Sequence, residues 1–323
     1  MALKAVNQFP VKVNELRFIH YGENATFKVI ADQQSYLLRL HRPENHTSLA
    51  IQEELSWVSY LKENSNIHVQ SPVKSKQGKF VVKQGLEHIP THLCTLLSWK
   101  DGRRIFKGLA PKHYLEVGML TAKLHDLASS WKTQHRRYWD AAGLIGPNAS
   151  YGPPFALKEV LNPTEFKILS DYQMMITQKI SAYEKKNPQN MSFIHADLHF
   201  GNLLWNKGKI TPIDFDDCGY GSYMYDLAVI LFSSRMIFQD FDRCKREQAI
   251  LELLKGYSQN ALLCDEDLAI IPYYVEARKL TMFAWLYHRI EHPTLRAYFE
   301  KNKSERIKNF KKSLKKPEFQ WPF

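Results

Sequence analysis

The stretch from Ser192 to Leu231 constrains this 323-residue chain more than any other part of it. It reads SFIHADLHFGNLLWNKGKITPIDFDDCGYGSYMYDLAVIL. Two short β-prone runs flank a Lys-Gly turn at residues 206–209, which is the pattern of a β-hairpin. The first arm follows Asp197 and Asn202, and the second arm ends on Asp214. One hairpin is therefore expected to bring these three side chains to a common point.

Phosphoryl transfer requires the groups that these side chains carry. A carboxylate must orient and deprotonate the acceptor hydroxyl, and oxygen ligands must hold the magnesium that bridges the nucleotide phosphates. The kinase catalytic loop has an aspartate followed five residues later by an asparagine, and Asp197 and Asn202 keep that spacing. Asp214 stands where the metal-binding aspartate of the next strand is expected. For either loop residue alone, a turn cap is the better interpretation, but the ordered set within one hairpin favours catalysis.

The pattern H-x-D-x-x-x-x-N at His195–Asn202 and the later I-D-[FLW]-[DEG] at 213–216 resemble the aminoglycoside phosphotransferase and choline kinase branch of the protein-kinase-like fold. The resemblance implies an α+β protein with two lobes, a small N-lobe on an antiparallel sheet and a larger, mostly helical C-lobe. It also implies Asp197 as catalytic base, Asn202 and Asp214 as magnesium ligands, and ATP and Mg²⁺ as cofactors.

The composition, 44% hydrophobic and 13% aromatic, is that of a globular protein. No apolar run approaches the roughly 20 residues of a membrane helix, and the N-terminus lacks the apolar core of a signal peptide. The four cysteines are scattered and form no C-x-x-C pair, so neither a zinc knuckle nor a disulfide framework is indicated. We expect a cytoplasmic protein without a membrane span, and the sequence does not indicate its oligomeric state.

A net charge of +11 favours polyanionic partners such as nucleotides or acidic surfaces. Much of the excess lies between residues 301 and 316, where apolar residues fall close to a helical stripe. An amphipathic helix with a solvated basic face is the favoured interpretation. No nucleic-acid motif accompanies it, so a specific nucleic-acid partner is not expected.

Alternating residues between Glu15 and Arg42 predict three strands, at 16–20, 26–30 and 35–40. In the kinase-like fold the first turn covers the ATP phosphates, which makes Gly22 and Asn24 candidate nucleotide-binding residues. This turn has one glycine and lacks the G-x-G-x-x-G pattern, so a plain hairpin turn is an equal alternative.

The third strand places Arg39 where kinases carry the phosphate-holding lysine. An arginine can still grip a phosphate oxygen and a carboxylate together. Its expected partner is Glu54 in the apolar-periodic helix at 51–61, with Glu53 as the competing partner and a surface arginine as the alternative. The Leu-Arg-Leu-His-Arg-Pro sequence before this helix also resembles a bacterial subgroup with stress-response kinases and type II homoserine kinases.

The apolar run at 94–99 is, by the same resemblance, the last strand of the N-lobe. Backbone groups near Leu97 and Trp99 would then hydrogen-bond the adenine edge. Strand-like segments largely stop at Ser98. We therefore expect a nucleotide-binding lobe at residues 1–98 and a catalytic and acceptor-binding lobe at residues 99–323.

Amphipathic spacing predicts helices over 114–131, 163–185, 272–290 and 295–314. His125 is interpreted as a packed structural residue, and Asp226 matches a family aspartate that accepts backbone N–H groups of the catalytic loop. Asp216 and Asp217 remain open between tuning the metal site, holding a basic group of the acceptor, and capping the next helix. Four residues of the later helices could either line an acceptor cleft or belong to the ordinary core: Tyr273, Tyr274, Arg278 and Trp285.

A rival motif, H-x-x-E-H at His288–His292, fits the inverted zinc-protease pattern. Pro293 follows at once and would end the helix, and few residues remain downstream for a third ligand. A chance match is therefore the preferred interpretation.

The sequence predicts an ATP-dependent phosphotransferase that moves the γ-phosphate to a hydroxyl of a small-molecule acceptor. An aminoglycoside, an amino alcohol, homoserine, a sugar and a protein serine all remain open, and the basic charge tilts mildly against cationic antibiotics. The first alternative is a Ser/Thr protein kinase of the stress-response type, with a protein substrate. The second is a nucleotide-binding module without catalysis.

Overall fold

The computed structural model describes residues 1–32, 34–43, 45–105 and 108–321. Packing divides the chain into two compact units. The first comprises residues 1–105, 134–136 and 201–216, and the second comprises the rest of the described chain. The first unit thus takes in two segments from later in the chain, and the predicted lobe boundary near Ser98 stays a prediction.

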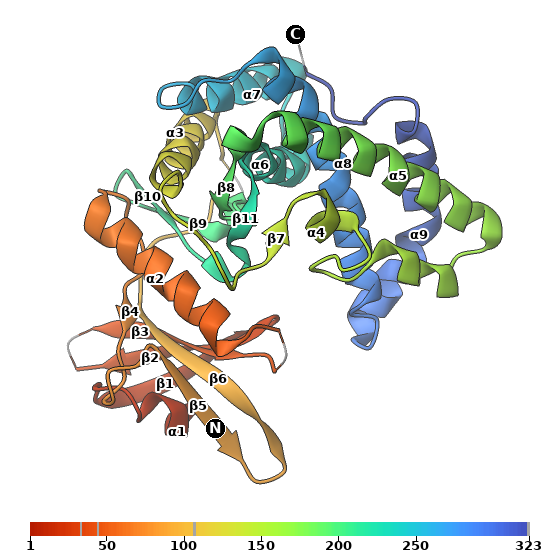
Figure 1. Ribbon diagram of the computed structural model, residues 1–323. Helices are drawn as coiled ribbons and strands as arrows, with labels where there is room; N and C mark the ends of the chain where they lie inside the picture. The colour runs from red at the N-terminus through yellow and green to blue at the C-terminus, as the bar shows by residue number, and fades with distance from the viewer. Residues whose placement is uncertain (33, 44, 106–107, 322–323) are drawn as a thin grey trace. The chain divides into compact units, whose positions relative to one another are not determined.

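The first unit is built on a six-stranded antiparallel sheet (Figure 1). The strand order is β1 (Val13–Tyr21), β2 (Asn24–Ala31), β3 (Ser35–His41), β6 (Ile89–Ser98) and β4 (Pro72–Val73), with β5 (Val81–Leu86) also paired to β6. The three strands predicted near the N-terminus are confirmed as β1, β2 and β3.

One face of this sheet is apolar and the other carries Arg39. Leu38 and Leu40 of β3 are buried with Val29 of β2 and with helix α1 (Ala2–Val6). Because side chains alternate along a strand, Arg39 between these two leucines lies on the opposite face. There it sits in mid-sheet, paired with Thr26 and Thr95 on the flanking strands.

Helix α2 (Ser48–Asn64) covers the face that carries Arg39 (Figure 1). The helix begins at Thr47, whose hydroxyl accepts the Ala50 N–H at 3.1 Å and so satisfies one free donor of the first turn. Ile51 and Leu55 are fully buried and pack on Leu97 of β6. Glu54 shares this helix face and is only 1% exposed.

The predicted hairpin forms within the first unit from β9 (Leu203–Asn206) and β10 (Lys209–Pro212). Lys207 and Gly208 fill its turn with φ values of 48° and 75°. A two-residue hairpin turn requires positive φ at both positions, which explains a glycine here. Trp205 also exchanges backbone hydrogen bonds with Arg103, at 3.0 and 3.1 Å, which anchors the hairpin.

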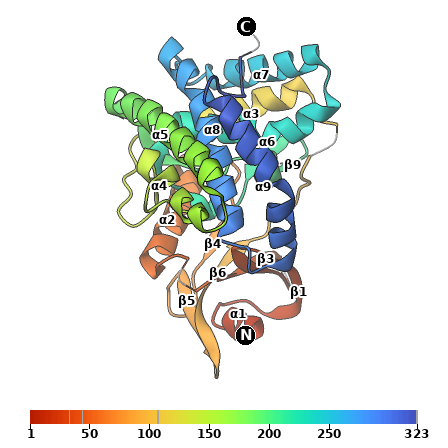
Figure 2. The same ribbon diagram turned by 90° about the vertical axis from the view of Figure 1, so that its right-hand side faces the viewer.

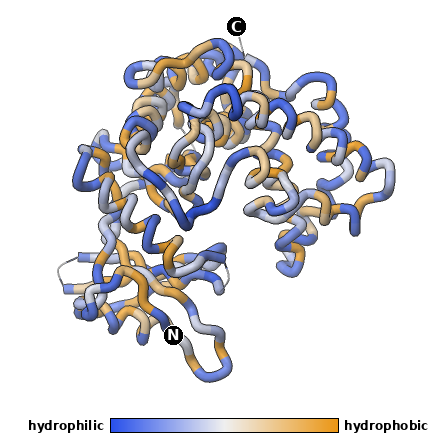
Figure 3. The backbone as a smooth tube through the Cα atoms, in the orientation of Figure 1, coloured by the Kyte–Doolittle hydropathy of each residue, from blue (hydrophilic) through white to orange (hydrophobic). Residues whose placement is uncertain are grey.

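The second unit is mostly helical (Figures 1 and 2). Its helices are α3 (Pro111–Ala128), α4 (Ala141–Ile145), α5 (Pro163–Lys186), α6 (Tyr223–Ile237), α7 (Arg243–Tyr257), α8 (Asp265–Tyr287) and α9 (Pro293–Ser313). Helices α3 and α7 lie side by side, because Gly118 and Gly256 let the two backbones approach closely. Hydrophobic and hydrophilic positions alternate along these helices (Figure 3), as expected where amphipathic helices share a core.

A small sheet of β7 (Tyr138–Trp139), β11 (Gly219–Ser222) and β8 (Met191–Ile194) completes the second unit. Strand β8 leads directly into the His195–Asn202 motif. Short 3₁₀ helices lie at Pro154–Glu159, Pro188–Asn190, Phe200–Asn202, Phe215–Asp217 and Phe238–Asp240. None of the helices within the described ranges is long and apolar enough to cross a bilayer.

Helix α8 begins at Asp265, seven residues before the predicted start at Pro272. A proline inside a helix frees the carbonyl four residues earlier, here that of Leu268. The indole N–H of Trp321 donates to this carbonyl at 2.8 Å. The C-terminal segment therefore supplies the hydrogen bond that Pro272 cannot make, and the helix continues through the proline.

The H-x-x-E-H motif lies across a helix break. His288 is the C-cap of α8 and His292 is the N-cap of α9, which begins at Pro293, two residues before the predicted start. The two histidines therefore do not share one helix face, which the zinc-protease pattern requires.

Candidate active site

Arg39 lies buried in the first unit and faces three carboxylates. Its guanidinium contacts Glu54 at 2.5 Å, and its Nη1 atom lies 3.7 Å from Asp216 and 3.9 Å from Asp214. Burial alone would lower the pKa of Arg39, but the three carboxylates hold it above its usual value. The predicted ion pair of Arg39 with Glu54 is therefore present.

Glu53, the competing partner, has a different role. Its carboxylate accepts the backbone N–H groups of Gln134 and His135 at 2.9 and 2.8 Å. Arg136 of the same segment donates to the Ala50 carbonyl at 3.3 Å. Helix α2 thereby binds residues 134–136 into the first unit on one side while it presents Glu54 to Arg39.

Asp216 is a buried anion surrounded by basic side chains. His46 Nε2 lies 3.5 Å from one carboxylate oxygen, and His41 Nδ1 lies 3.6 Å from the other. Burial and then the charge of Arg39 lower the pKa of His41 to about 3, so its ring is neutral. Burial opposes the ionisation of Asp216, but the hydrogen bond and charge of His46, together with the charge of Arg39, hold its pKa well below the usual value. Asp216 is thus a fixed negative charge beside Arg39. It does not cap the next helix, because the N-cap of α6 is Ser222.

The two predicted metal ligands, Asn202 and Asp214, lie at the two ends of the hairpin in the first unit. The Ile213 N–H donates to the Asn202 carbonyl at 2.9 Å, which ties the two ends of the hairpin together. Asp214 follows with a φ of 64°, a conformation that residues with a Cβ atom rarely adopt. Its side chain is 53% exposed, in contrast to the buried Asn202. Such local strain collects at functional sites, where the surrounding structure maintains it.

The donor set and charge of this region fit a magnesium ion. Carboxylate and amide oxygens, as on Asp214 and Asn202, are the ligands that hard divalent cations prefer. Arg39 faces three carboxylates, of which Asp214 is the exposed one. Within the described residues, no group of three or more histidine, cysteine, aspartate or glutamate side chains could hold a metal by itself. Mg²⁺ typically takes one or two protein carboxylates and completes its shell with phosphates and water.

Asp197 lies in the second unit, in a loop that Asp226 holds in place. The fully buried Asp226 carboxylate accepts the N–H groups of His195 at 3.0 Å and Ala196 at 2.8 Å. His125 Nε2 contacts the same carboxylate at 3.1 Å. Ala196 has a φ of 63°, so the backbone turns sharply just before Asp197. The structural roles predicted for Asp226 and His125 are both confirmed.

Arg278 of α8 forms an ion pair with Asp197. The Arg278 guanidinium also lies 3.3 Å from the Tyr225 hydroxyl, and His199 Nε2 lies 3.4 Å from the second oxygen of Asp197. Burial alone would raise the pKa of Asp197, but Arg278 and then His199 hold it below its usual value. Asp197 is therefore ionised at neutral pH. The sequence did not predict this pair, because 81 residues separate its members and no motif links them.

Asp217 is held by groups of the second unit. The Tyr151 hydroxyl donates to its carboxylate, and Arg137 Nη1 lies 3.5 Å from it. The Trp139 indole N–H donates to the Asp217 carbonyl at 2.6 Å. Of the roles left open by the sequence, helix capping does not apply, because α6 is capped by Ser222.

The remaining predicted nucleotide-binding residues lie in the first unit. Gly22 and Asn24 form the turn between β1 and β2, where the Gly22 N–H donates to the Asn24 carbonyl at 3.1 Å. Leu97 is buried in β6. The Trp99 N–H donates to the Ser35 carbonyl at 3.0 Å, so an adenine contact through this group would require exchanging that bond. Nucleotide binding by these residues stays a prediction.

The predicted catalytic set is divided between the two units. Asn202 and Asp214 lie together in the first unit, whereas Asp197 lies in the second, four residues before the chain enters the first at Gly201. The convergence of all three side chains on one point stays a prediction.

Comparison with known proteins places the chain in a family. The model of the phosphotransferase enzyme family matches residues 16–262. Amicoumacin kinase of Bacillus subtilis (strain 168) is 23% identical over 300 residues, which cover 90% of this chain and 85% of that protein.

Two solved structures share the fold. The microcompartment-associated aminopropanol kinase has a TM-score of 0.82 and 25% identity, and the match covers 99% of this chain and 98% of that one. The amicoumacin kinase hAmiN, solved with AMP-PNP, Ca²⁺ and Ami, has a TM-score of 0.77 and 22% identity over 99% of this chain and 94% of that one. The expected α+β protein-kinase-like fold is thus confirmed. Because the family model spans most of the chain, the protein belongs to the phosphotransferase enzyme family and is a kinase.

Proposed function

We propose that this kinase transfers the γ-phosphate of ATP to a hydroxyl group of a small-molecule acceptor. The observation that carries the proposal is the group of oxygen and guanidinium side chains in the first unit, where Arg39 faces Glu54, Asp214 and Asp216. Such a group suits a metal ion together with the phosphates of a nucleotide. The relatives named above are known as kinases of amicoumacin and of aminopropanol, which supports a small acceptor.

Each residue of the proposed mechanism has a distinct task. Arg39, fixed by Glu54, would donate to phosphate oxygens with its planar guanidinium. Asn202 and Asp214 would hold Mg²⁺, which when bound would neutralise charge on the phosphates. Asp197 would accept a hydrogen bond from the acceptor hydroxyl and orient it for attack. A carboxylate with a lowered pKa is a weak base, which suits a reaction whose catalysis is mostly positioning and electrostatics.

The experiment that tests the proposal measures ADP formation with Mg²⁺, ATP and a panel of hydroxyl compounds. The panel contains amino alcohols, aminoglycosides, amicoumacin, homoserine and simple sugars, and mass spectrometry of the products detects the phosphate ester. We expect at least one small compound to stimulate ADP formation and to gain one phosphoryl group. Radiolabel that enters only protein would favour a Ser/Thr protein kinase instead. Nucleotide binding without turnover on any compound would favour a module without catalysis.

Replacing Asp197 tests its role as the residue that orients the acceptor. Asp197→Asn should lower kcat by at least about a hundredfold, the range for loss of one acid–base group, while the Kd of MgATP changes little. Asp126→Asn, on the exposed surface of α3, is the control and should keep its activity. Turnover within a few-fold of the unaltered enzyme in Asp197→Asn would show that Asp197 does not act on the acceptor.

Replacing Asp214 tests its role as a metal ligand. Asp214→Ala should weaken MgATP binding by about tenfold or more, because a divalent cation loses a charged ligand. ATP binding in the presence of EDTA should be the same in both proteins, which serves as an internal control. Isothermal titration calorimetry measures both affinities. Equal MgATP affinities in the two proteins would rule out Asp214 as a ligand.

Arg278 is proposed as a positioning residue that keeps Asp197 ionised. The wild-type pKa of Asp197 is lowered, so its carboxylate is charged well into the acidic range. In Arg278→Gln, burial is no longer opposed by the guanidinium, and the pKa of Asp197 should rise. The acid limb of the kcat/KM profile should then move to higher pH, whereas Arg278→Lys should keep it close to its original position. An acid limb that stays in place in Arg278→Gln would contradict this role.

A further inference from the structure

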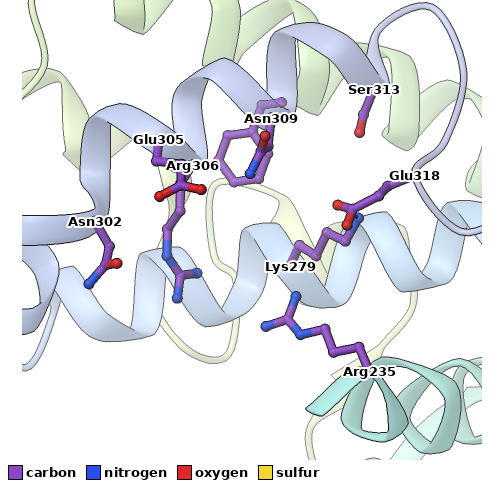
Figure 4. Close-up of a pocket in the computed structure, with 9 residues that line it drawn as sticks. Arg235, Lys279, Asn302, Glu305, Arg306, Asn309, Ser313 and Glu318 are labelled. Atoms are coloured by element: carbon purple, nitrogen blue, oxygen red, sulfur yellow. Dashed lines mark hydrogen bonds and ion pairs between the residues drawn. The ribbon is translucent and has the colours of Figure 1, made fainter. Parts of the chain in front are cut away.

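A pocket of about 200 Å³ lies between α6, α8 and α9 in the second unit, and none of its lining residues was placed in the candidate active site (Figure 4). Three cationic side chains line it: Arg235 from α6, Lys279 from α8 and Arg306 from α9. The family model ends at residue 262, so α8 and α9, which form most of the pocket, lie beyond it. The basic C-terminal helix, whose role the sequence left open, supplies one wall.

Neither arginine of this pocket forms a close ion pair with a carboxylate among the residues that the structure describes, although the charges of Glu318 and Glu276 act on Arg235 from farther away. Arg235 stacks on the Phe232 ring at 3.9 Å, and Arg306 lies 3.4 Å from the Tyr298 hydroxyl. The packing around Arg235, and next the positive charge of Arg306, lower the pKa of Arg235. Two guanidinium groups that repel each other, with several donors unused, are a receptor for an anion.

The floor of the pocket is a buried network that fixes the third cation. Lys279 Nζ contacts Glu276 at 2.8 Å and Glu318 at 2.6 Å. Glu276 is fully buried and also accepts the backbone N–H of Glu318 at 2.7 Å. Together with the bond from Trp321 to Leu268, these contacts fasten the C-terminal segment to α8. The pocket is therefore bounded by a segment held at several points.

The carboxylates around the pocket are held mainly by Lys279 and not by the two arginines. Lys279 engages both Glu276 and Glu318, and Glu305 lies on the exposed surface of α9, so three cations and three carboxylates balance in formal charge. Burial would raise the pKa of Glu318, but Lys279, Arg235 and Lys312 hold it below its usual value. What favours an anion here is therefore the hydrogen-bond donors of Arg235 and Arg306, and not a net positive charge. Neutral donors complete the lining: Asn302, Asn309 and Ser313.

The pocket is smaller than the roughly 300–1,000 Å³ of sites for drug-sized ligands. A nucleotide is therefore too large for it, whereas one tetrahedral anion with its first waters fits. We propose that this pocket is a second, non-catalytic site that binds a small phosphate-bearing anion, with Arg235 and Arg306 donating to its oxygens. Inorganic phosphate and the phosphate group of a small ester share this chemistry. The proposal does not depend on the acceptor or on the catalytic residues.

The test titrates inorganic phosphate and, in a second arm, glycerol phosphate into the full-length protein by calorimetry. Ionic strength is held constant with sodium chloride, and saturating AMP-PNP with Mg²⁺ keeps phosphate out of the nucleotide site. Arg235→Gln and Arg306→Gln should each weaken binding by about tenfold or more, the loss expected for one charge-assisted contact. Glu305→Gln should strengthen it, because one repelling charge is removed. Lys308→Gln, exposed on the same helix, carries the same charge change as Arg306→Gln and should have little effect.

The outcomes separate the proposal from a general attraction to the basic helix. Equal losses in Lys308→Gln and Arg306→Gln would overturn it, as would phosphate binding no stronger than that of chloride. Melting temperatures of all variants check folding, and Arg306→Lys, which keeps the charge, should recover part of the affinity. Comparing the Kd of inorganic phosphate with that of glycerol phosphate identifies whether free phosphate or a phosphate ester is the better ligand.

Discussion

The ion pair between Arg39 and Glu54 is the interaction on which the chemistry of the first unit depends. Both side chains are nearly inaccessible to water, at 4% and 1% exposure, so each charge needs the other. The pair joins β3, in the middle of the sheet, to α2. The position of α2 therefore determines where the Arg39 guanidinium is held. With Glu54 committed to Arg39, Asp214 and Asp216 are two further carboxylates, 3.9 and 3.7 Å from the same guanidinium.

The second unit holds a carboxylate ionised in a fixed place. Asp226 uses its carboxylate to bind backbone N–H groups, and so shapes the loop that carries Asp197. Arg278 then opposes the penalty that burial imposes on the charge of Asp197. Ala196, directly before the proposed catalytic residue Asp197, and Asp214, the proposed metal ligand, both adopt positive φ. Backbone strain thus accompanies both parts of the proposed machinery.

Local order along the chain made much of this structure predictable. Alternating apolar and polar residues predicted the strands around Arg39, and the Lys-Gly turn predicted the hairpin. The apolar periodicity of residues 51–61 predicted the helix that carries Glu54. Long-range partners were not predictable, because a single sequence does not record which distant side chains meet. Arg278 pairs with Asp197 across 81 residues. From the sequence alone, Pro272 is expected to start a helix. In the structure the helix continues through it, because the Trp321 indole, 53 residues from Leu268, donates to the Leu268 carbonyl that the proline leaves without its helical partner.

The most direct test of the central claim is a double-mutant cycle on Arg39 and Glu54, with the Kd of MgATP as the readout. If Glu54 acts by holding Arg39, then Arg39→Gln and Glu54→Gln should each weaken MgATP binding by about tenfold or more, and the double variant should bind about as weakly as Arg39→Gln alone. The melting temperature of each variant separates loss of binding from loss of folding. Additive effects, or MgATP binding that neither single variant alters, would contradict the account.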